Sequence, residues 1–296
     1  MFSGLSAFPL TPMRQGAVDE PAFAALVQRL ARAGVDAIGA LGSTGSYAYL
    51  DRAERARVAR LAVDCAAGVP VMVSIGAVAT RDVLALADDA QRAGVAAVLL
   101  APVSYQPLTE AEVFGLYRDA SSALSVPLCV YDNPGTTRFA FSDDLYARIA
   151  DLPQVRSIKI PGVPAEPAAA SARVARLRAL LPAHVSIGVS GDVVGATGMN
   201  AGCDAWYSVV GGLFPLATLA ITRAAQAGDA AGAVRLSARL EPLWALFRAH
   251  GSVRVIGAAA ELQGLAATPC LPAPLQALDG AARQQLAAFL TGAALD

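Results

Sequence analysis

Short apolar runs alternate along the chain with longer segments in which apolar residues recur every three or four positions. The short runs have the length and composition of buried strands, whereas the three-to-four spacing is typical of amphipathic helices. Clear examples of the helical pattern are PAFAALVQRLARA (21–33) and TRDVLALADDAQRA (80–93). The pattern predicts eight strands, near 4–9, 37–41, 70–75, 96–101, 127–131, 155–160, 185–190 and 205–210.

Three segments repeat one junction between helix and strand: RAGVDAIGAL (32–41), RAGVAAVLLA (92–101) and NAGCDAWYSV (200–209). In each, a glycine placed to end a helix is followed by a strand that is apolar on both faces. Such strands are typical of a parallel sheet covered by helices. Eight of these units predict an α/β fold of the (β/α)8 TIM barrel type. A doubly wound open sheet is the alternative, because the repeat alone does not establish closure.

The strand pattern stops after residue 224, and three further helical stretches follow, near 229–249, 252–264 and 279–293. We therefore expect a barrel catalytic domain over 1–224 and an appended C-terminal helical region over 225–296. Hydrophobic residues make up 55% of the 296 and charged residues 16%, which is typical of a compact globular protein. The net charge of −1 gives no global attraction to nucleic acid or to an anionic membrane.

Composition also limits the chemistry. The four cysteines have no CxxC spacing, which predicts free thiols and a cytoplasmic protein. The start of the chain lacks the features of a signal peptide, and Gly211, Gly212 and Pro215 interrupt the uncharged stretch 205–222, so no membrane span is expected. The two histidines, His184 and His250, argue against a histidine-rich metal site. No GxGxxG follows a strand, and neither a metal nor an organic cofactor is expected.

Lys159, within SIKIPG (157–162), is the only lysine, whereas arginine occurs 22 times. A guanidinium does not lose its proton in a protein, but a buried amine can, and it can then act as a base or form a Schiff base. Chance survival of one lysine is the alternative. The residue lies where the sixth strand ends, and barrel active sites form at the carboxyl ends of the strands.

Other suggestive residues lie at the same rim. Tyr131 ends the fifth strand, the turn GSTGS (42–46) follows the second, and SGD (190–192) follows the seventh. Backbone N–H groups and hydroxyls clustered in such a turn can hold a carboxylate without a formal charge. Each feature also has a purely structural interpretation, as a packing residue or an ordinary turn.

The chain resembles the dihydrodipicolinate synthase and N-acetylneuraminate lyase family of class I aldolases. The resemblance is carried by AFPLTPMRQGAVD (7–19), by GSTGS in place of the family's GTTGE, and by VYDNPGTT (130–137), SIKIPG and VSGDVVG (189–195). It implies a homo-oligomeric barrel, a tetramer or a dimer, with C-terminal helices. It also implies that Lys159 forms the Schiff base and that Tyr131 shuttles protons. The residues expected to bind the substrate are Ser43, Thr44, Gly45, Thr136, Arg138 and Tyr207, with a catalytic role for Ser43 as well.

Three departures from the family's motifs concern the second substrate. Ser46 replaces the glutamate of GTTGE, and Thr136 stands where the synthases carry an arginine for a carboxylate. Arg138, two residues later, is a candidate to compensate. The synthases borrow a tyrosine from a neighbouring subunit, and an ungapped count places Ser104 there, with Tyr105 one step beyond as a further catalytic candidate.

The expected reaction is condensation of pyruvate with an aldehyde, or cleavage of a 2-oxo acid to pyruvate, through a lysine imine. Three outcomes remain open within that chemistry: a true dihydrodipicolinate synthase that uses aspartate semialdehyde, a lyase of sugar acids or sialic acids, and a dehydratase of 2-keto-3-deoxy sugar acids. The missing arginine argues against the first. A barrel that binds a 2-oxo acid as a sensor, without turnover, is the alternative outside enzymes.

Overall fold

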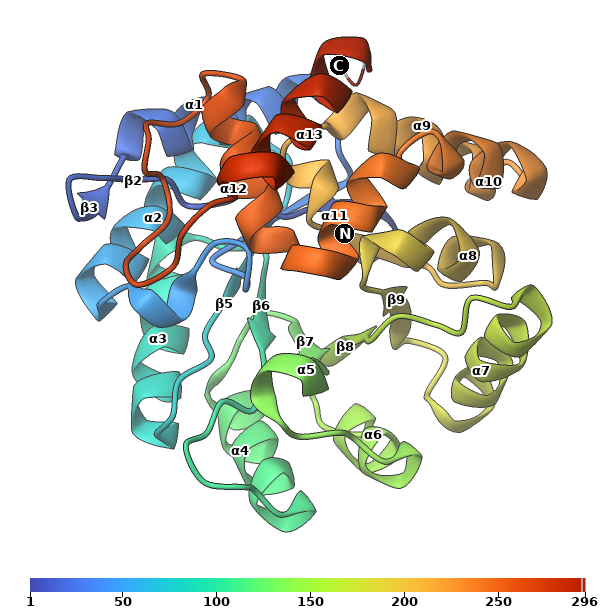
Figure 1. Cartoon of the computed structure of the whole chain (residues 1–296). Coiled ribbons are helices and arrows are strands. Elements are labelled where there is room, and N and C mark those ends of the chain that lie inside the picture. Colours follow the sequence, from blue (N-terminus) through green and yellow to red (C-terminus); the bar gives the residue numbers. More distant parts are fainter. Residues whose placement is uncertain (294, 296) are drawn as a thin grey trace.

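Eight parallel strands close into a barrel in the computed structural model, which describes residues 1–293 and 295 (Figure 1). The strands are neighbours in the order β1-β10-β9-β8-β7-β6-β5-β4, so the chain closes by pairing its first strand with its last. This closure confirms the predicted barrel, and the open doubly wound sheet is wrong. The strands are β1 (Gly4–Ala7), β4 (Ala37–Ala40), β5 (Val71–Ser74), β6 (Ala97–Leu100), β7 (Leu128–Tyr131), β8 (Val155–Ile160), β9 (Ser186–Val189) and β10 (Ala205–Ser208). A small hairpin of β2 (Met13–Arg14) and β3 (Ala17–Val18) follows β1.

Helices that alternate with the strands cover the outside of the barrel. Gly34 and Gly94 adopt left-handed conformations, with φ of 76° and 82°, and end α1 and α3 as the repeated junction predicts. The helices of this layer are α1 (Glu20–Ala33), α2 (Arg52–Cys65), α3 (Thr80–Ala93), α4 (Glu110–Ala123), α6 (Asp143–Ala150), α7 (Pro167–Leu180), α8 (Gly195–Asn200) and α9 (Pro215–Gln226). Shorter helical turns, α5 (Pro134–Thr137), η1 (Tyr47–Tyr49), η2 (Asp192–Val194) and η3 (Val210–Gly212), follow strand ends.

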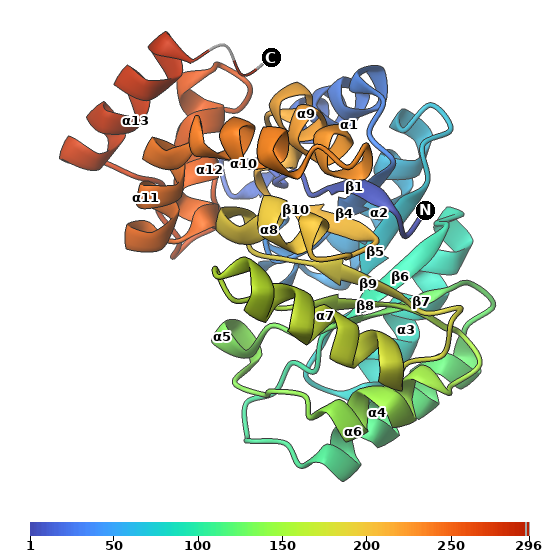
Figure 2. The ribbon, with the colours of Figure 1, turned by 90° about the vertical axis from the view of Figure 1, so that its right-hand side faces the viewer.

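Four helices complete the chain: α10 (Ala230–Ala238), α11 (Glu241–His250), α12 (Ser252–Leu262) and α13 (Gly280–Gly292). The single helix predicted over 229–249 is wrong, because the helix ends before Pro242, which occupies the first turn of α11 and has no N–H to continue it. Figure 2 shows α11, α12 and α13 gathered beside one part of the barrel. Helix α9 runs across the expected boundary at 224/225, and the division into two domains stays a prediction.

The barrel interior holds its own apolar cluster, separate from the core between strands and helices. Its largest members are Phe8, Tyr131 and Tyr207, which lie on or beside three different strands. Gly188 leaves the room that one of these rings occupies, since a Cβ there would lie 2.1 Å from the Tyr207 ring. Three aromatic rings therefore fill the barrel directly beneath the rim. Within the described part of the chain, no helix has both the length and the apolar character needed to cross a membrane.

Candidate active site

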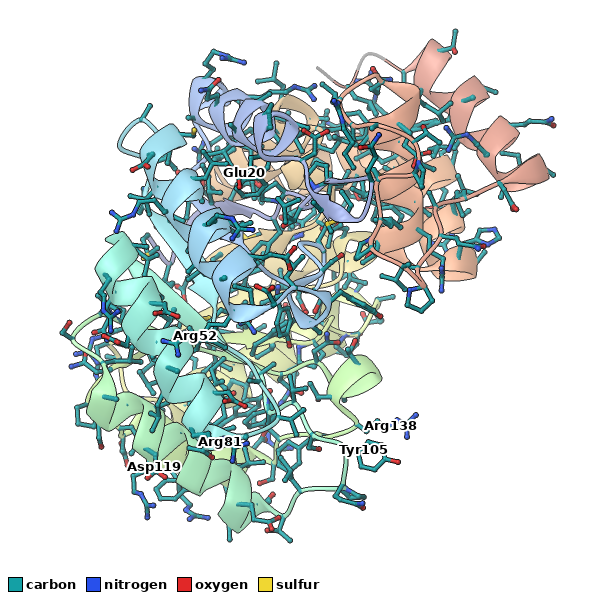
Figure 3. The ribbon with its side chains drawn as sticks, turned by 90° about the vertical axis from the view of Figure 1, so that its left-hand side faces the viewer. Glu20, Arg52, Arg81, Tyr105, Asp119 and Arg138 are labelled. Atoms are coloured by element: carbon teal, nitrogen blue, oxygen red, sulfur yellow. The ribbon has the colours of Figure 1, made fainter. Side chains whose placement is uncertain are left out.

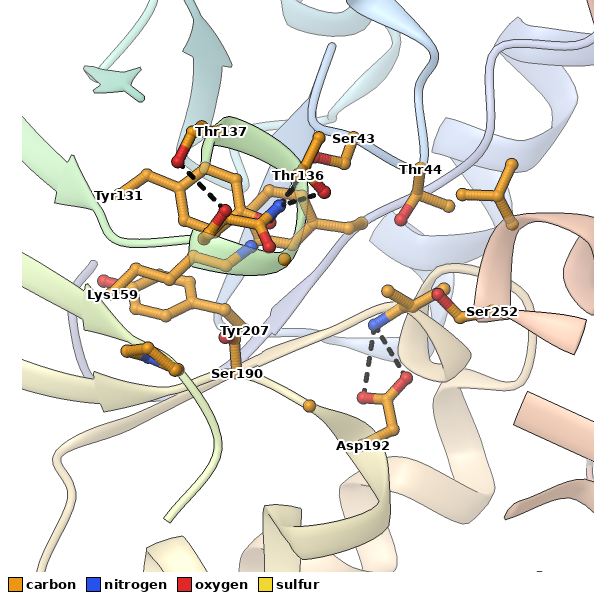
Figure 4. A pocket seen from close by; sticks show the side chains of 18 of the residues that line it. Ser43, Thr44, Tyr131, Thr136, Thr137, Lys159, Ser190, Asp192, Tyr207 and Ser252 are labelled. Atoms are coloured by element: carbon orange, nitrogen blue, oxygen red, sulfur yellow. Dashed lines mark hydrogen bonds between the residues drawn. The ribbon is translucent and has the colours of Figure 1, made fainter. Parts of the chain in front are cut away.

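Lys159 lies near the carboxyl end of β8, at the floor of a cavity of about 730 Å³ in the mouth of the barrel. The strand register places it opposite Tyr131 on β7 and Gly188 on β9. Its backbone carbonyl accepts a hydrogen bond of 3.0 Å from the N–H of Asp132, which fixes the end of the strand. Figure 4 shows the Lys159 and Tyr131 side chains together on one side of the pocket. The sole lysine is therefore both buried, at 4% exposure, and open to a ligand.

The Lys159 ammonium is surrounded by aromatic faces. Its Nζ lies 3.9 Å from the ring centre of Phe8, 4.1 Å from that of Tyr131 and 5.5 Å from that of Tyr207. Among the described residues no carboxylate forms an ion pair with it. The rings stabilise the cation through their quadrupoles but cannot take its proton. The nitrogen is thus held in place without a base that would compete for its proton.

A chain of polar side chains starts at the Tyr131 hydroxyl. Tyr131 Oη lies 3.5 Å from Ser43 Oγ, and Asn133 Nδ2 donates to Tyr131 Oη at 3.0 Å and to Thr136 Oγ1 at 3.1 Å. The short helix α5 begins just after Asn133, and the side-chain amide of Asn133 lies against the end of β7, where it reaches Tyr131. Asn133 was not predicted as a site residue from the sequence. Its only signal was an Asn-Pro pair at the end of a strand, which is more commonly a simple turn.

The GSTGS turn contributes two hydroxyls to the cavity. Ser43 and Thr44 both line the cavity. The Thr44 side chain is buried, at 3% exposure, and its hydroxyl has no hydrogen-bond partner in the part of the chain described. Gly45 does not line the cavity; a Cβ there would lie 3.0 Å from the Leu41 backbone, so its role is to keep the turn tight. Ser46 supports the same turn with a left-handed φ of 53°.

Asp192 is the buried carboxylate below the opposite wall. It accepts hydrogen bonds from Trp206 Nε1 (3.1 Å), Ser208 Oγ (2.9 Å) and the N–H of Val210 (2.8 Å). Burial raises the pKa of the Asp192 carboxyl to about 6, although these donors and the charge of Lys159 lower it. At neutral pH the Asp192 carboxyl is therefore ionised. It holds the start of η3 through the N–H of Val210, and its negative charge interacts with the positive charge of Lys159.

Three predicted residues lie differently from expectation. Tyr207 turns its ring to the lysine, but its hydroxyl bonds Ser157 Oγ at 2.6 Å in the barrel interior, so it does not offer that hydroxyl to a ligand. Arg138 is exposed at the end of α5, where its φ of 57° directs the chain away, and it does not line the cavity. Tyr105 is 90% exposed and lies outside the cavity, whereas Ser104 lines it. Figure 3 shows Tyr105 and Arg138 projecting outward from the ribbon.

The C-terminal helices close the remaining side of the cavity, which the sequence analysis did not predict. Ser252, at the first turn of α12, faces the pocket in Figure 4, and Arg248 and Arg254 also line it. Arg248 is paired with Glu241 on its own helix. Over residues 1–293 and 295, no cluster of three or more His, Cys, Asp or Glu side chains is placed to hold a metal ion.

Comparisons with known proteins show which family the chain resembles. The model of the dihydrodipicolinate synthetase family matches residues 1–293. A 4-hydroxy-tetrahydrodipicolinate synthase of Methylococcus capsulatus is 32% identical over 82% of this chain and 82% of its own, and one of Parvibaculum lavamentivorans is 30% identical over 100% and 99%. The crystal structure of a dihydrodipicolinate synthase from Agrobacterium tumefaciens superposes with a TM-score of 0.94 at 47% identity, covering 98% of this chain and 97% of that one.

Replacement of Asp192 tests the electrostatics of the site. Because its folded pKa of about 6 exceeds the ordinary 3.8, the folded state binds more protons than the unfolded state between these values. The free energy of unfolding should therefore fall by about 2 kcal/mol as pH rises from 4 to 6. In Asp192→Asn we expect a lower stability overall but a flatter profile over that window, measured by urea unfolding at each pH.

The exposed Asp64→Asn variant serves as the control and should keep the wild-type slope. Some slope will persist in Asp192→Asn, because burial also raises the pKa of Asp132. Parallel profiles for Asp192→Asn and the wild type would contradict the assignment.

Proposed function

The chain belongs to the dihydrodipicolinate synthetase family of lysine Schiff-base lyases and synthases that act on pyruvate, and from that membership we propose that Lys159 forms the imine. One observation carries the proposal. The only lysine of the chain is buried at the cavity floor, in register with Tyr131, and has no carboxylate partner among the described residues. Such a nitrogen is available to a carbonyl, because nothing beside it holds its proton in an ion pair.

The proposed reaction begins when the neutral amine of Lys159 adds to the C2 carbonyl of a 2-oxo acid. Tyr131 donates a proton to the resulting hydroxyl, water leaves, and an iminium forms. The Tyr131 phenolate accepts a proton from C3 to give an enamine, which attacks an aldehyde carbon while Tyr131 returns that proton to the aldehyde oxygen. Addition of water then releases the product and the free amine. The same steps in reverse cleave a 2-oxo acid into pyruvate and an aldehyde.

The carboxylate of the 2-oxo acid is assigned to the GSTGS turn. The hydroxyls of Ser43 and Thr44 face the cavity, and that of Thr44 has no other partner in the part of the chain described. Ser43 also adjoins the Tyr131 hydroxyl, so it can pass a proton as well as bind the acid. This arrangement gives the site polarity at one end of the substrate without a formal positive charge there.

For the second substrate we favour a hydroxylated, uncharged aldehyde, which corresponds to lyase action on a sugar acid. Asn133 and Thr136 offer a neutral amide and hydroxyl at the wall beside Tyr131, and Arg138 does not line the cavity. The arginines that do line it, Arg248 and Arg254, lie on the C-terminal helices at another side, and Arg248 is paired with Glu241. A neutral pair matches hydroxyl groups better than a carboxylate, which requires a charged or bidentate partner. The names of the relatives favour a second candidate, dihydrodipicolinate synthase itself, in which pyruvate condenses with aspartate semialdehyde.

The proposal extends to a homo-oligomer. Tyr49, Val78 and Tyr105 are exposed by 47%, 68% and 90%, and they lie in the loops that follow the neighbouring strands β4, β5 and β6. Within the described residues of one protomer, the hydroxyl chain from Tyr131 ends at Ser43. A second copy seated on this edge would cover the exposed side chains, and its Tyr105 could extend the relay. The four cysteines are free thiols, which supports a cytoplasmic location.

Reductive trapping tests the imine. Incubation with pyruvate and borohydride should place one adduct on Lys159, since the chain's amino terminus is the only other amine. Lys159→Arg should lose the adduct and the activity, because guanidinium does not form an imine. Tyr131→Phe should still bind pyruvate but lose about 10²- to 10⁴-fold in kcat. Pyruvate binding without an adduct in the wild type would point to a sensor instead.

A panel of aldehydes and 2-keto-3-deoxy sugar acids, followed by pyruvate consumption or release, tests the second substrate. The wild type should prefer hydroxylated, uncharged aldehydes to aspartate semialdehyde. Thr136→Arg should shift the preference toward the anionic aldehyde by about 10-fold or more, because it adds a charged donor at that wall. Thr136→Ser is the control and should leave the preference unchanged. Loss of the sugar acid without pyruvate release would identify a dehydratase.

Sedimentation velocity tests the assembly. The wild type should sediment as a dimer or tetramer, and Tyr105→Asp should dissociate it, because a buried unpaired carboxylate opposes association. Leu180→Asp is the matched control: Leu180 is 43% exposed on α7, away from the loops of β4 to β6, and its replacement should leave the assembly intact. A wild-type protein that stays monomeric at micromolar concentration would refute the proposed interface.

A further inference from the structure

We propose that Phe8 is a positioning residue for the Schiff base, whose ring face holds the Lys159 nitrogen as a cation during imine formation. The inference rests on the proposed function of Lys159. Phe8 lies just past the end of β1, far from Lys159 in the sequence, and no motif of the chain connects the two residues. Its ring centre is nevertheless closer to Lys159 Nζ than that of either tyrosine, at 3.9 Å.

The position of the Phe8 ring is built into the barrel. Its N–H donates to the carbonyl of Ser208 at 2.9 Å, and its ring meets the Tyr207 ring edge-on, with centres 6.1 Å apart and planes at 82°. On the other side two glycines make room for it. A Cβ at Gly39 would lie 2.4 Å from Phe8 Cζ, and one at Gly42 would lie 2.6 Å from Phe8 Cδ1.

Because real Cβ contacts do not approach so closely, neither glycine can be replaced while the ring stays in place. Gly39 is central in β4, where a glycine weakens the strand and commonly marks a close approach of other atoms. At 2% exposure, the ring has no room to leave the lysine. Gly39 on β4 and Gly42 in the following turn therefore leave the space in which the Phe8 ring lies against the Lys159 ammonium.

The chemistry explains why a phenyl ring suits this place. The nitrogen carries a positive charge as the resting ammonium and again as the iminium, and between these states it must be neutral to attack the carbonyl. A carboxylate would stabilise both cations but would also hold the proton of the ammonium. An aromatic face stabilises a cation and accepts no proton, so it leaves proton transfer to Tyr131.

The three rings are not equivalent in this respect. The Tyr131 hydroxyl takes part in the polar chain with Asn133 and Ser43, and the reaction changes its protonation. Tyr207 lies farther away, at 5.5 Å, and its hydroxyl is engaged below with Ser157. Phe8 alone has no hydroxyl and no other polar partner to satisfy. Its ring face therefore stabilises the cation without taking part in proton transfer.

Fluorinated phenylalanines at position 8 provide the test, because each fluorine weakens the ring quadrupole while nearly preserving its volume. The full-length protein carrying 4-fluoro-, 3,5-difluoro- or 3,4,5-trifluorophenylalanine is titrated with pyruvate, and the adduct trapped by borohydride is quantified by mass. We expect the imine to weaken stepwise with each fluorine, because the iminium keeps one N–H where the ammonium has three and therefore depends more on the ring face for the stabilisation of its charge. Phe8→Leu, which removes the ring face, should weaken it by about 5- to 30-fold, the equivalent of about 1–2 kcal/mol.

The sole lysine also allows a direct structural readout. Protein labelled with [ε-¹³C]lysine contains one labelled residue, and the ring currents of Phe8 and Tyr131, whose centres lie 3.9 and 4.1 Å from Lys159 Nζ, should shift its methylene protons upfield. Phe8→Leu should return that signal toward its ordinary position. Phe23→Leu, in which an equally buried phenylalanine of α1 is shortened, is the matched control and should change neither the signal nor the imine.

The outcomes separate this inference from the function on which it rests. If pyruvate is trapped on Lys159 equally well in all fluorinated forms, Phe8 is only a packing residue and the Schiff-base function stands. An effect of Phe8→Leu equal to that of Phe23→Leu has the same meaning. If the wild type traps no pyruvate, the proposed function fails, and the role of Phe8 in imine formation fails with it.

Discussion

The burial of one ammonium group at the end of β8 is the constraint on which the rest of the site depends. Lys159 is 4% exposed, and no carboxylate among the described residues pairs with it. Removing a cation from water costs several kcal/mol unless its surroundings offset the loss. The aromatic rings and the charge of Asp192 provide that compensation in different ways, since the rings act at contact distance and the carboxylate acts through space.

The same constraint accounts for the distribution of small and large residues in the barrel. The Phe8 and Tyr207 rings occupy space that Gly39, Gly42 and Gly188 leave open on neighbouring strands. Each glycine lowers the stability of the folded backbone, because it loses more conformational entropy on folding than other residues do. Filling the barrel interior alone does not require this loss, whereas placing aromatic ring faces against a cation does. The fold and the site are thus specified by the same residues.

The sequence predicted the barrel well, because strands buried on both faces appear as continuous apolar runs and the glycine junctions mark where helices end. It also predicted that Lys159 and Tyr131 share one rim, since position in the repeat determines the end of the strand. The contacts of Phe8 with Lys159 and of Asn133 with Tyr131 were missed, because both depend on where side chains meet in space. Arg138 has a left-handed backbone at the end of α5 and is exposed outside the cavity, which no residue pattern predicted. The helix break before Pro242 was visible in the sequence and should have been predicted.

The residues that we propose for the reaction and those that we propose for substrate selection lie on different kinds of structural element. Lys159 and Tyr131 lie on paired strands, where the barrel register fixes them relative to each other. Ser46 and Thr136, which depart from the family's motifs, lie in turns that follow strands. A strand residue cannot shift without moving its neighbours, whereas a loop can change with little cost to the barrel. The chemistry of this chain can therefore be inferred from its family with more force than its second substrate, for which we propose the wall formed by Asn133 and Thr136 as the determinant.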